Sequence, residues 1–274
     1  LSSSSAASDV YKRQVYICSR TYRMSVSIYH SSFHTCKRFF ELFTNITNNT
    51  AIVFNTYGIE VKCSNPKIKI NSILDESSFT KYTCDEKIIL AISIRSINNI
   101  WKKHTTNTPI RILYSGQNTI LFIINNNSTY SIPCTIIDDS AYIDRIHMFD
   151  DVDYQVEFEI SPSFLYSFIK KNHKTSTTDK PIHSIHFKSD VKNQDIYIQH
   201  MRLPASKQTE RYHFITTIQE SYIFNYINQI IKNNSKQKIK TLLVGLYTHK
   251  SMKILSYVDS CSYIEYYIPP IKQI

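Results

Sequence analysis

A run of acidic residues near the middle of the chain is the first candidate for chemistry. Residues 138–153 (DDSAYIDRIHMFDDVD) contain six aspartates, and Glu157 and Glu159 follow. Clustered carboxylates bind hard cations, but this run does not have the D-x-D-x-D-G loop with a glutamate at the twelfth position. A solvated linker is therefore the favoured interpretation. A metal-dependent enzyme that uses these acids is kept as a remote alternative.

Other catalytic constellations are missing from the sequence. It contains no G-x-x-x-x-G-K-[ST], G-x-G-x-x-G, G-x-S-x-G or H-E-x-x-H motif, and only three glycines. His183 and His186 have an odd spacing, which places them on opposite faces of a predicted strand. The six cysteines are scattered without a C-x-x-C pair, so neither a zinc site nor a redox pair is indicated. We expect no catalytic residues, no metal and no cofactor.

Positive charge is the second chemical feature. The formal net charge of +10 favours a polyanionic partner, because lysine and arginine gain affinity by releasing counterions from phosphates. The cations gather on four predicted helices: Lys37 and Arg38 on the first, Arg95, Lys102 and Lys103 on the second, Lys170, Lys171 and Lys174 on the third, and Lys232 on the fourth. A helix end carrying lysine is also favoured by the macrodipole, so each residue alone is weak evidence.

The elements that position these cations form two similar halves. Apolar periodicity predicts helices at 32–46, 94–103, 161–172 and 221–232. Alternation predicts strands at 51–55, 59–63, 67–74, 88–93, 110–114, 120–125 and 130–137, and then at 154–160, 182–187, 195–201, 212–218, 241–247, 252–257 and 263–268. The order of elements repeats, which indicates an α+β fold with two related domains.

The predicted domain boundaries follow from this order. We expect a non-native or disordered leader at 1–23, with Met24 as the candidate start, an N-terminal domain at 24–137, a connecting loop at 138–153 and a C-terminal domain at 154–274. No apolar run approaches the roughly 18 residues that a membrane span needs, so no membrane partner is expected.

Several ordered segments carry a family resemblance. Tyr263–Ile268 (YIEYYI) ends in Pro269 and Pro270, and residues 58–62 (GIEVK), 67–74 (KIKINSIL), 79–85 (FTKYTCD) and 94–102 precede it in a fixed order. From Met24 to Lys272 this set resembles the sliding clamps of the proliferating cell nuclear antigen (PCNA) family. The resemblance implies a homotrimeric ring around double-stranded DNA that holds a DNA polymerase and other replication or repair proteins through PCNA-interacting peptides, with a clamp loader as a further partner.

The resemblance also implies two sites. Lys37, Arg38, Lys102, Lys170 and Lys232 match positions where clamps line the hole with cations, whereas Asn99 and Asn225 replace cations there. Strands 130–137 and 195–201 are expected to pair between subunits. The peptide site is implied at Ser64 (or Cys63), Lys67, Ile68, Ile146, Met148, Phe149, Met252, Tyr267, Ile268, Pro269 and Pro270. Lys67 stands where a histidine is common and Pro269 replaces a small residue, which implies an altered peptide preference.

The strong positive charge departs from the family, because cellular clamps are usually acidic overall. It motivates an alternative, a processivity factor of clamp fold that holds DNA by charge as a monomer or dimer. The abundance of Ile, Asn, Lys and Tyr is typical of AT-rich coding sequence, such as that of a large DNA virus or a protist. We therefore expect the protein in the nucleus or at a cytoplasmic viral replication site.

Overall fold

The structure is a computed structural model that describes residues 25–105, 107–139, 142, 154–175, 184–190, 192–193, 195–198, 201–202, 208–214 and 218–271. The predicted leader 1–23, His183 and residues 143–153, with Ile146, Met148 and Phe149, lie outside the described residues.

The elements of each half follow one another in the same order. The first half comprises β1 (Val26–His30), α2 (His34–Glu41), β2 (Asn49–Asn55), β3 (Gly58–Asn65), β4 (Ile68–Asp75), the 3₁₀ turn η1 (Glu76–Ser78), β5 (Lys81–Cys84), β6 (Ile88–Ser93), α3 (Ile94–Trp101), β7 (Ile110–Tyr114), β8 (Thr119–Ile124) and β9 (Ser128–Ile136). The second half comprises β10 (Val156–Ile160), α5 (Pro162–Thr175), β11 (Ser184–Asp190), β12 (Asp195–Ile198), β13 (Met201–Arg202), β14 (Gln208–Phe214), β15 (Gln219–Ile223), α6 (Phe224–Lys236), β16 (Leu242–Leu246), β17 (Met252–Tyr257) and β18 (Tyr263–Ile268). Both halves read strand, helix, five strands, helix, three strands, so the predicted α+β fold with two similar domains is confirmed.

The pairing of strands repeats as well. In the first half β1 lies between β5 and β7, and β2 lies between β6 and β3, which pairs with β4. In the second half β10 lies between β14 and β16, and β11 lies between β15 and β12, which pairs with β13. The β6–β9 pairing has a reduced counterpart in the bridge between Tyr222 and Pro270. The two halves are therefore one architecture built twice.

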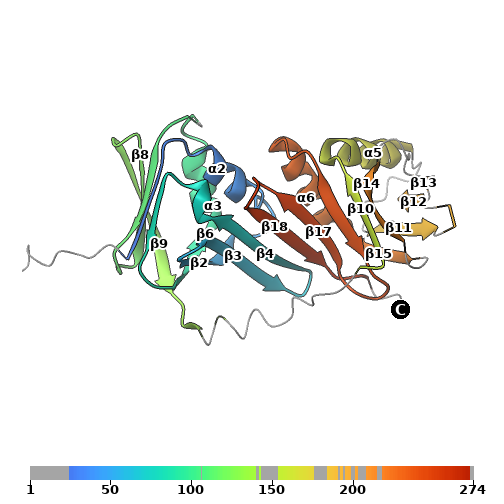
Figure 1. Cartoon of the computed structure of the whole chain (residues 1–274), viewed down its shortest axis with the longest axis horizontal. Coiled ribbons are helices and arrows are strands. Elements are labelled where there is room, and N and C mark those ends of the chain that lie inside the picture. Colours follow the sequence, from blue (N-terminus) through green and yellow to red (C-terminus); the bar gives the residue numbers. More distant parts are fainter. Residues whose placement is uncertain are drawn as a thin grey trace, which may run out of the picture.

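The halves are joined through a shared sheet. Strand β18 pairs antiparallel with β4, from Tyr263 opposite Ile73 to Tyr267 opposite Lys69, which makes a sheet of 14 strands across the two halves. Figure 1 shows the joint at the centre of the molecule, with β4 and β18 side by side. Two hydrogen bonds also join the halves: the Asn233 side chain of α6 donates to the carbonyl oxygens of Leu42 (3.0 Å) and Thr44 (2.8 Å), just after α2.

The helices pack on the sheets through aromatic and aliphatic side chains. Trp101 at the end of α3 is fully buried; its ring stacks on Phe33 (centroids 5.3 Å apart) and meets Phe122 of β8 edge-on (5.7 Å). Helix α3 begins where the Ser93 hydroxyl accepts a hydrogen bond from the Ser96 amide, an N-cap. Because one face of each helix is committed to the core, charged residues are left for the opposite face.

Several elements differ from the sequence predictions: α2 ends at Glu41 where the helix was predicted to reach residue 46, and β14 covers Gln208–Phe214 where a strand was predicted at 212–218. Strand β1 was not predicted at all, and residues 219–223 form β15 although the helix was predicted to begin at Ser221. The segment QESYI has no apolar alternation, but Glu220, Ser221 and Tyr222 are all buried against β11. Pairing within the sheet overrides the local pattern at this point.

Candidate nucleic-acid interface and peptide site

The predicted cations lie on helices that share one side of the molecule. Figure 1 shows α2, α3, α5 and α6 along the upper side of the two halves. Arg95 and Lys102–Lys103 near α3, and Lys170 and Lys171 on α5, are exposed, whereas Lys37 and Arg38 on α2 and Lys232 on α6 are half-buried. Lys174 belongs to α5, and its side chain lies outside the described residues. The helices that carry or precede the described cations thus lie along one side of the molecule.

Weak local contacts hold several of these cations. Lys37 lies 3.9 Å from Glu41 one turn later, Lys102 donates to Asn99 at 3.5 Å, and Lys103 lies over the Tyr130 ring at 5.5 Å. A long, partly exposed ion pair such as Lys37–Glu41 contributes little, on the order of 0–1 kcal/mol, so it competes poorly with phosphates. The helical side therefore offers cations that a polyanion can recruit.

Arg38 differs from the other cations. Its guanidinium Nε is buried and has no hydrogen-bond partner among the described residues. Burial lowers the pKa of Arg38, and the carboxylate of Asp259 opposes that shift. Lys238 and Lys240, which follow α6, line the same hollow as Arg38. Sequence reasoning missed these two lysines, because only the fold brings the end of α6 next to α2.

The described members of the predicted peptide site meet at one end of the joint sheet. Ser64 pairs with Lys69, which in turn pairs with Tyr267, and Met252 pairs with Ile268. The structure therefore places the β3–β4 turn, with Lys67 and Ile68, beside the start of β17 and the end of β18.

These residues divide into surface and core. Ser64 and Lys67 are exposed and Pro269 and Pro270 are half-buried, whereas Ile68, Met252 and Ile268 have no exposed surface. Tyr267 is 9% exposed, and its hydroxyl donates to Glu265 at 3.1 Å. Among the described residues of this site, the polar side chains and the prolines form its surface, and the aliphatic ones belong to the core.

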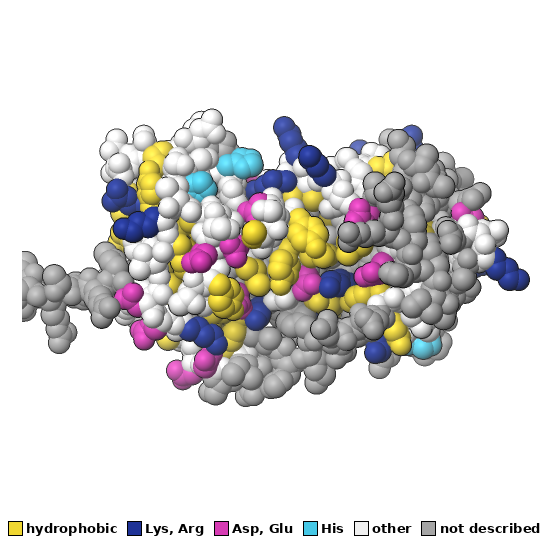
Figure 2. All heavy atoms as spheres, viewed as in Figure 1, with side chains coloured by type: hydrophobic (Ala, Val, Ile, Leu, Met, Phe, Trp, Pro, Cys, Tyr) yellow, Lys and Arg dark blue, Asp and Glu magenta, His cyan; other side chains and the backbone are white. Residues whose placement is uncertain are grey.

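A charged network crosses the joint beside this corner. Glu265 of β18 accepts from Asn71 of β4 (3.0 Å) and pairs with Lys253 of β17 (2.7 Å). The Lys253 ammonium also lies 5.9 Å from the ring centroids of Tyr154 and Tyr267. Figure 2 shows apolar side chains gathered near the centre of this view, interspersed with acidic and basic groups.

The acidic run is described only at its beginning. Asp139 forms an ion pair with Lys87 (2.5 Å), and Tyr142 is buried against Val53 and Ile89. Over the described part of the chain, no group of three or more His, Cys, Asp or Glu side chains is placed to hold a metal ion. Asp144, Asp150, Asp151 and Asp153 lie outside that part.

Comparison with known proteins agrees with this architecture. Residues 14–138 match the family model described as "Proliferating cell nuclear antigen, N-terminal domain". The first half of the chain is therefore similar to the N-terminal domain of the PCNA family. The match to the PCNA domain includes residues 14–23, which the sequence analysis assigned to the leader, and it ends where the predicted connecting loop begins.

Solved PCNA structures share the fold over both halves. A PCNA from Entamoeba histolytica superposes with a TM-score of 0.74 at 13% identity, covering 91% of this chain and 100% of that one. A chain of the PCNA2–PCNA3 complex from Sulfolobus tokodaii superposes with a TM-score of 0.71 at 12% identity, covering 89% and 98%. A search of curated protein sequences found no match. The second half, which the family model does not reach, thus has the PCNA fold as well.

No helix within the described ranges combines the length and the apolar character that crossing a bilayer requires.

Proposed function

We propose that the chain is a sliding clamp, a homotrimer that closes around duplex DNA and tethers a DNA polymerase and other replication proteins, without catalytic residues of its own. The PCNA fold supports a clamp-type role. The trimer, the polymerase and repair partners, the clamp loader, the peptide site and the nuclear or viral replication site are finer points of the proposal.

The proposal rests on two sheet edges, one in each half, that have no partner strand among the described residues although the equivalent strands β18 and β4 pair with each other. Within the chain, the last strand of the second half, β18, pairs with β4, the third strand after the first helix of the first half. The equivalent strands are β9, which ends the first half, and β13 in the second. Among the described residues, Ser128–Pro133 of β9 pair only with β8, and β13 pairs only with β12.

Pairing β9 of one chain with β13 of the next would repeat the in-chain joint between chains. Such head-to-tail contacts close into a ring when the rotation permits, and closure removes exposed sheet edges. Three chains would supply six halves. The sequence analysis assigned the second edge to 195–201, but β12 lies between β11 and β13, so the edge strand is β13 and only Met201 of that range belongs to it.

Duplex DNA fits the helical side of such a ring. Long cations that contact phosphates bind without reading bases, so the clamp moves along the duplex at little cost. Retention then depends on closure, because a closed ring leaves DNA only over an end.

Salt resistance on circular DNA tests the proposal. Protein loaded on nicked circular DNA should stay bound when the salt concentration is raised, and it should be released when a restriction enzyme linearises the circle. Protein bound to short linear duplex should dissociate steeply with salt, because that encounter is electrostatic.

The controls separate the proposal from its alternative. Equal salt sensitivity on circular and linear DNA would contradict topological retention, and it would favour the processivity factor that holds DNA by charge as a monomer or dimer. The net charge of +10 is the observation behind that alternative. Cleavage of the circle on addition of Mg²⁺ would instead revive the metal-dependent enzyme.

A further inference from the structure

A hollow of about 560 Å³ lies at the joint, between the two helices that meet there. It is lined by α2 (His34 and Arg38), by the segment that follows α6 (Gln237–Thr241) and by the β17–β18 turn (Tyr257–Asp259). Its volume is within the range of roughly 300–1,000 Å³ that small-molecule sites occupy. The lining is basic, with one arginine and two lysines against a single carboxylate.

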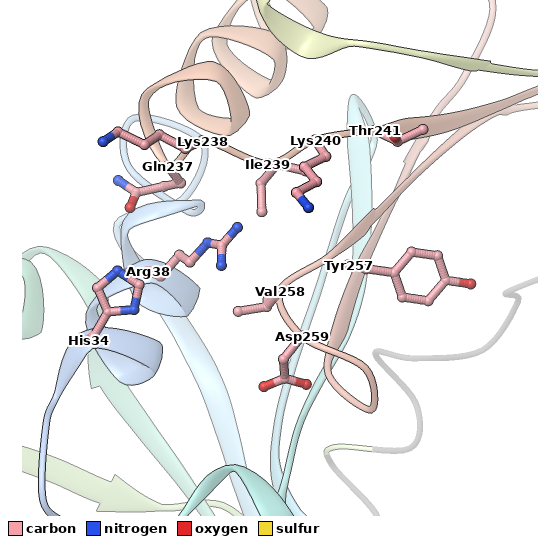
Figure 3. Close-up of a pocket in the computed structure, with 10 residues that line it drawn as sticks. All are labelled: His34, Arg38, Gln237, Lys238, Ile239, Lys240, Thr241, Tyr257, Val258 and Asp259. Carbon is pink, nitrogen blue, oxygen red and sulfur yellow. The ribbon is translucent and has the colours of Figure 1, made fainter. Parts of the chain in front are cut away.

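Some charged side chains that line the hollow are directed into it, and others are directed away from it. Figure 3 shows the Arg38 guanidinium and the Lys240 ammonium directed into the space, with Ile239 and Val258 on its walls. Lys238 extends outward, and the Asp259 carboxylate is turned away from the centre. That carboxylate accepts hydrogen bonds from the Ser78 hydroxyl (2.7 Å) and from the Ser262 amide (2.7 Å), so its acceptor capacity is largely used elsewhere.

Within the described part of the chain, no hydrogen bond or ion pair holds the Arg38 guanidinium in the hollow. Its Nε is buried and unbonded, and neither Arg38 nor Lys240 forms a hydrogen bond or ion pair with another described residue. A partly desolvated guanidinium without an acceptor is costly, and an entering anion would remove that cost. The planar guanidinium matches two oxygens of a phosphate group, and a lysine adds a point charge beside it.

The walls are fixed in position. After α6 the chain turns at Lys238, whose φ is +55°, and the amides of Gln237 and Ile239 bond to Asn233 and Asn234 at 3.0 and 3.1 Å. Gln237 also donates to Glu41 of α2 at 2.6 Å. A lysine in the left-handed region, where glycine is usual, indicates that the turn is held by its surroundings. Lys240 is therefore presented from a rigid segment.

We propose that this hollow is a binding site for a phosphate group, held by Arg38 and Lys240. The inference rests on the proposed function in one respect, which is that the phosphate belongs to the backbone of the duplex on the helical side. Free phosphate or pyrophosphate has the same chemistry, so the two sources are separated by experiment. Each chain would then hold one phosphate at a defined place, in addition to the diffuse attraction of the exposed helix cations.

The test uses the full chain with Arg38→Gln and Lys240→Gln together. Glutamine keeps much of the aliphatic stem that packs in the hollow, so folding should persist, as checked by thermal unfolding. The matched control is Lys81→Gln with Arg111→Gln, which removes the same charge from two exposed strand residues outside the helices.

The first arm titrates pyrophosphate and follows binding by calorimetry. Wild type and control should bind it saturably, and the hollow variant should bind at least about tenfold more weakly, because it cannot form the charge-assisted hydrogen bonds. Equal binding by all three proteins, or binding by none, would overturn the phosphate site.

The second arm measures the affinity for a short duplex as a function of salt. The slope of log K against log salt should become shallower by about 0.9 in the hollow variant, because one phosphate fewer is neutralised, and it should not change in the control. Pyrophosphate binding with unchanged duplex slopes would overturn the backbone as the source and leave free phosphate as the ligand. Absence of duplex binding by wild type would refute the proposed function, and the first arm would still decide the phosphate site.

Discussion

Asp259 shows how one side chain ties the two halves together. It lies in the β17–β18 turn of the second half and accepts hydrogen bonds from Ser78 in the first half and from the amides of Cys261 (3.0 Å) and Ser262 (2.7 Å). Burial by itself would raise the pKa of this carboxyl group, but the hydrogen bonds together outweigh burial and hold the pKa below its ordinary value of 3.8. The folded protein thus favours the ionised form.

Replacement of Asp259 by asparagine should change the pH dependence of stability. A folded-state pKa below the unfolded one contributes stability above the unfolded pKa, and that stability is lost as the pH falls through the folded value. Asp259→Asn should therefore lower the free energy of unfolding by about 1–3 kcal/mol at pH 7 and flatten its decline below pH 3.8. Denaturant unfolding at neutral and acidic pH checks this; the exposed Asp85→Asn serves as control. An unaltered decline in the Asp259 variant would contradict the assignment.

At the scale of elements, a strong apolar periodicity was sufficient to predict a strand or helix from the sequence, and a weak one was not. Strand β4 alternates buried and half-buried residues along its whole length, and it was predicted from that pattern. Strand β1 was missed because its alternation, buried Val26 and Ile28 on either side of half-buried Ser27, is only three residues long. Its partners on both sides, β5 and β7, are distant in sequence. The positions of Lys37, Arg38, Arg95, Lys170 and Lys232 on helices were likewise predictable from apolar spacing. The hollow was not predictable, since Arg38 and Lys240 are distant in sequence and come together only where α2 and the end of α6 meet at the joint.

The strand ends at the joint define how the peptide site is best tested. Ile68, Met252 and Ile268 are fully buried, so replacing them with serine would destabilise the core by roughly 2–5 kcal/mol and confuse the result. Lys67→Glu combined with Pro269→Glu changes the surface of the corner instead. We expect this pair to weaken, by at least about tenfold, the binding of a synthetic peptide with a glutamine, an aliphatic and an aromatic anchor.

Fluorescence anisotropy of the labelled peptide measures this loss. Lys81→Glu on β5 is the control for reversing the charge of an exposed lysine, because β5 lies at the far end of the 14-stranded sheet from this corner. Unchanged affinity in the corner variant, with an unchanged melting temperature, would show that peptides bind elsewhere.

At the scale of the whole molecule, the repeat predicts an assembly of fixed size. The full chain has a mass of 32.1 kDa, so a closed trimer should have three times that mass, about 96 kDa. Light scattering across a dilution series should give this value without intermediate masses, because head-to-tail edges are satisfied only on closure. A monomer at every concentration that still binds DNA would contradict the ring, and a mass that grows with concentration would indicate open chains.

The proposed pairing of β9 with β13 would also give the assembly a direction. Strands β9 and β13 are different surfaces, so every chain joined through them points the same way around the ring, and no two-fold axis relates its top to its bottom. The two faces would then present different residues, and only one would carry the corner formed by β3, β4, β17 and β18. A polymerase held at that corner would always lie on the same side of the ring and would face one way along the duplex. The order of strands in a single chain would therefore determine the direction in which the polymerase faces.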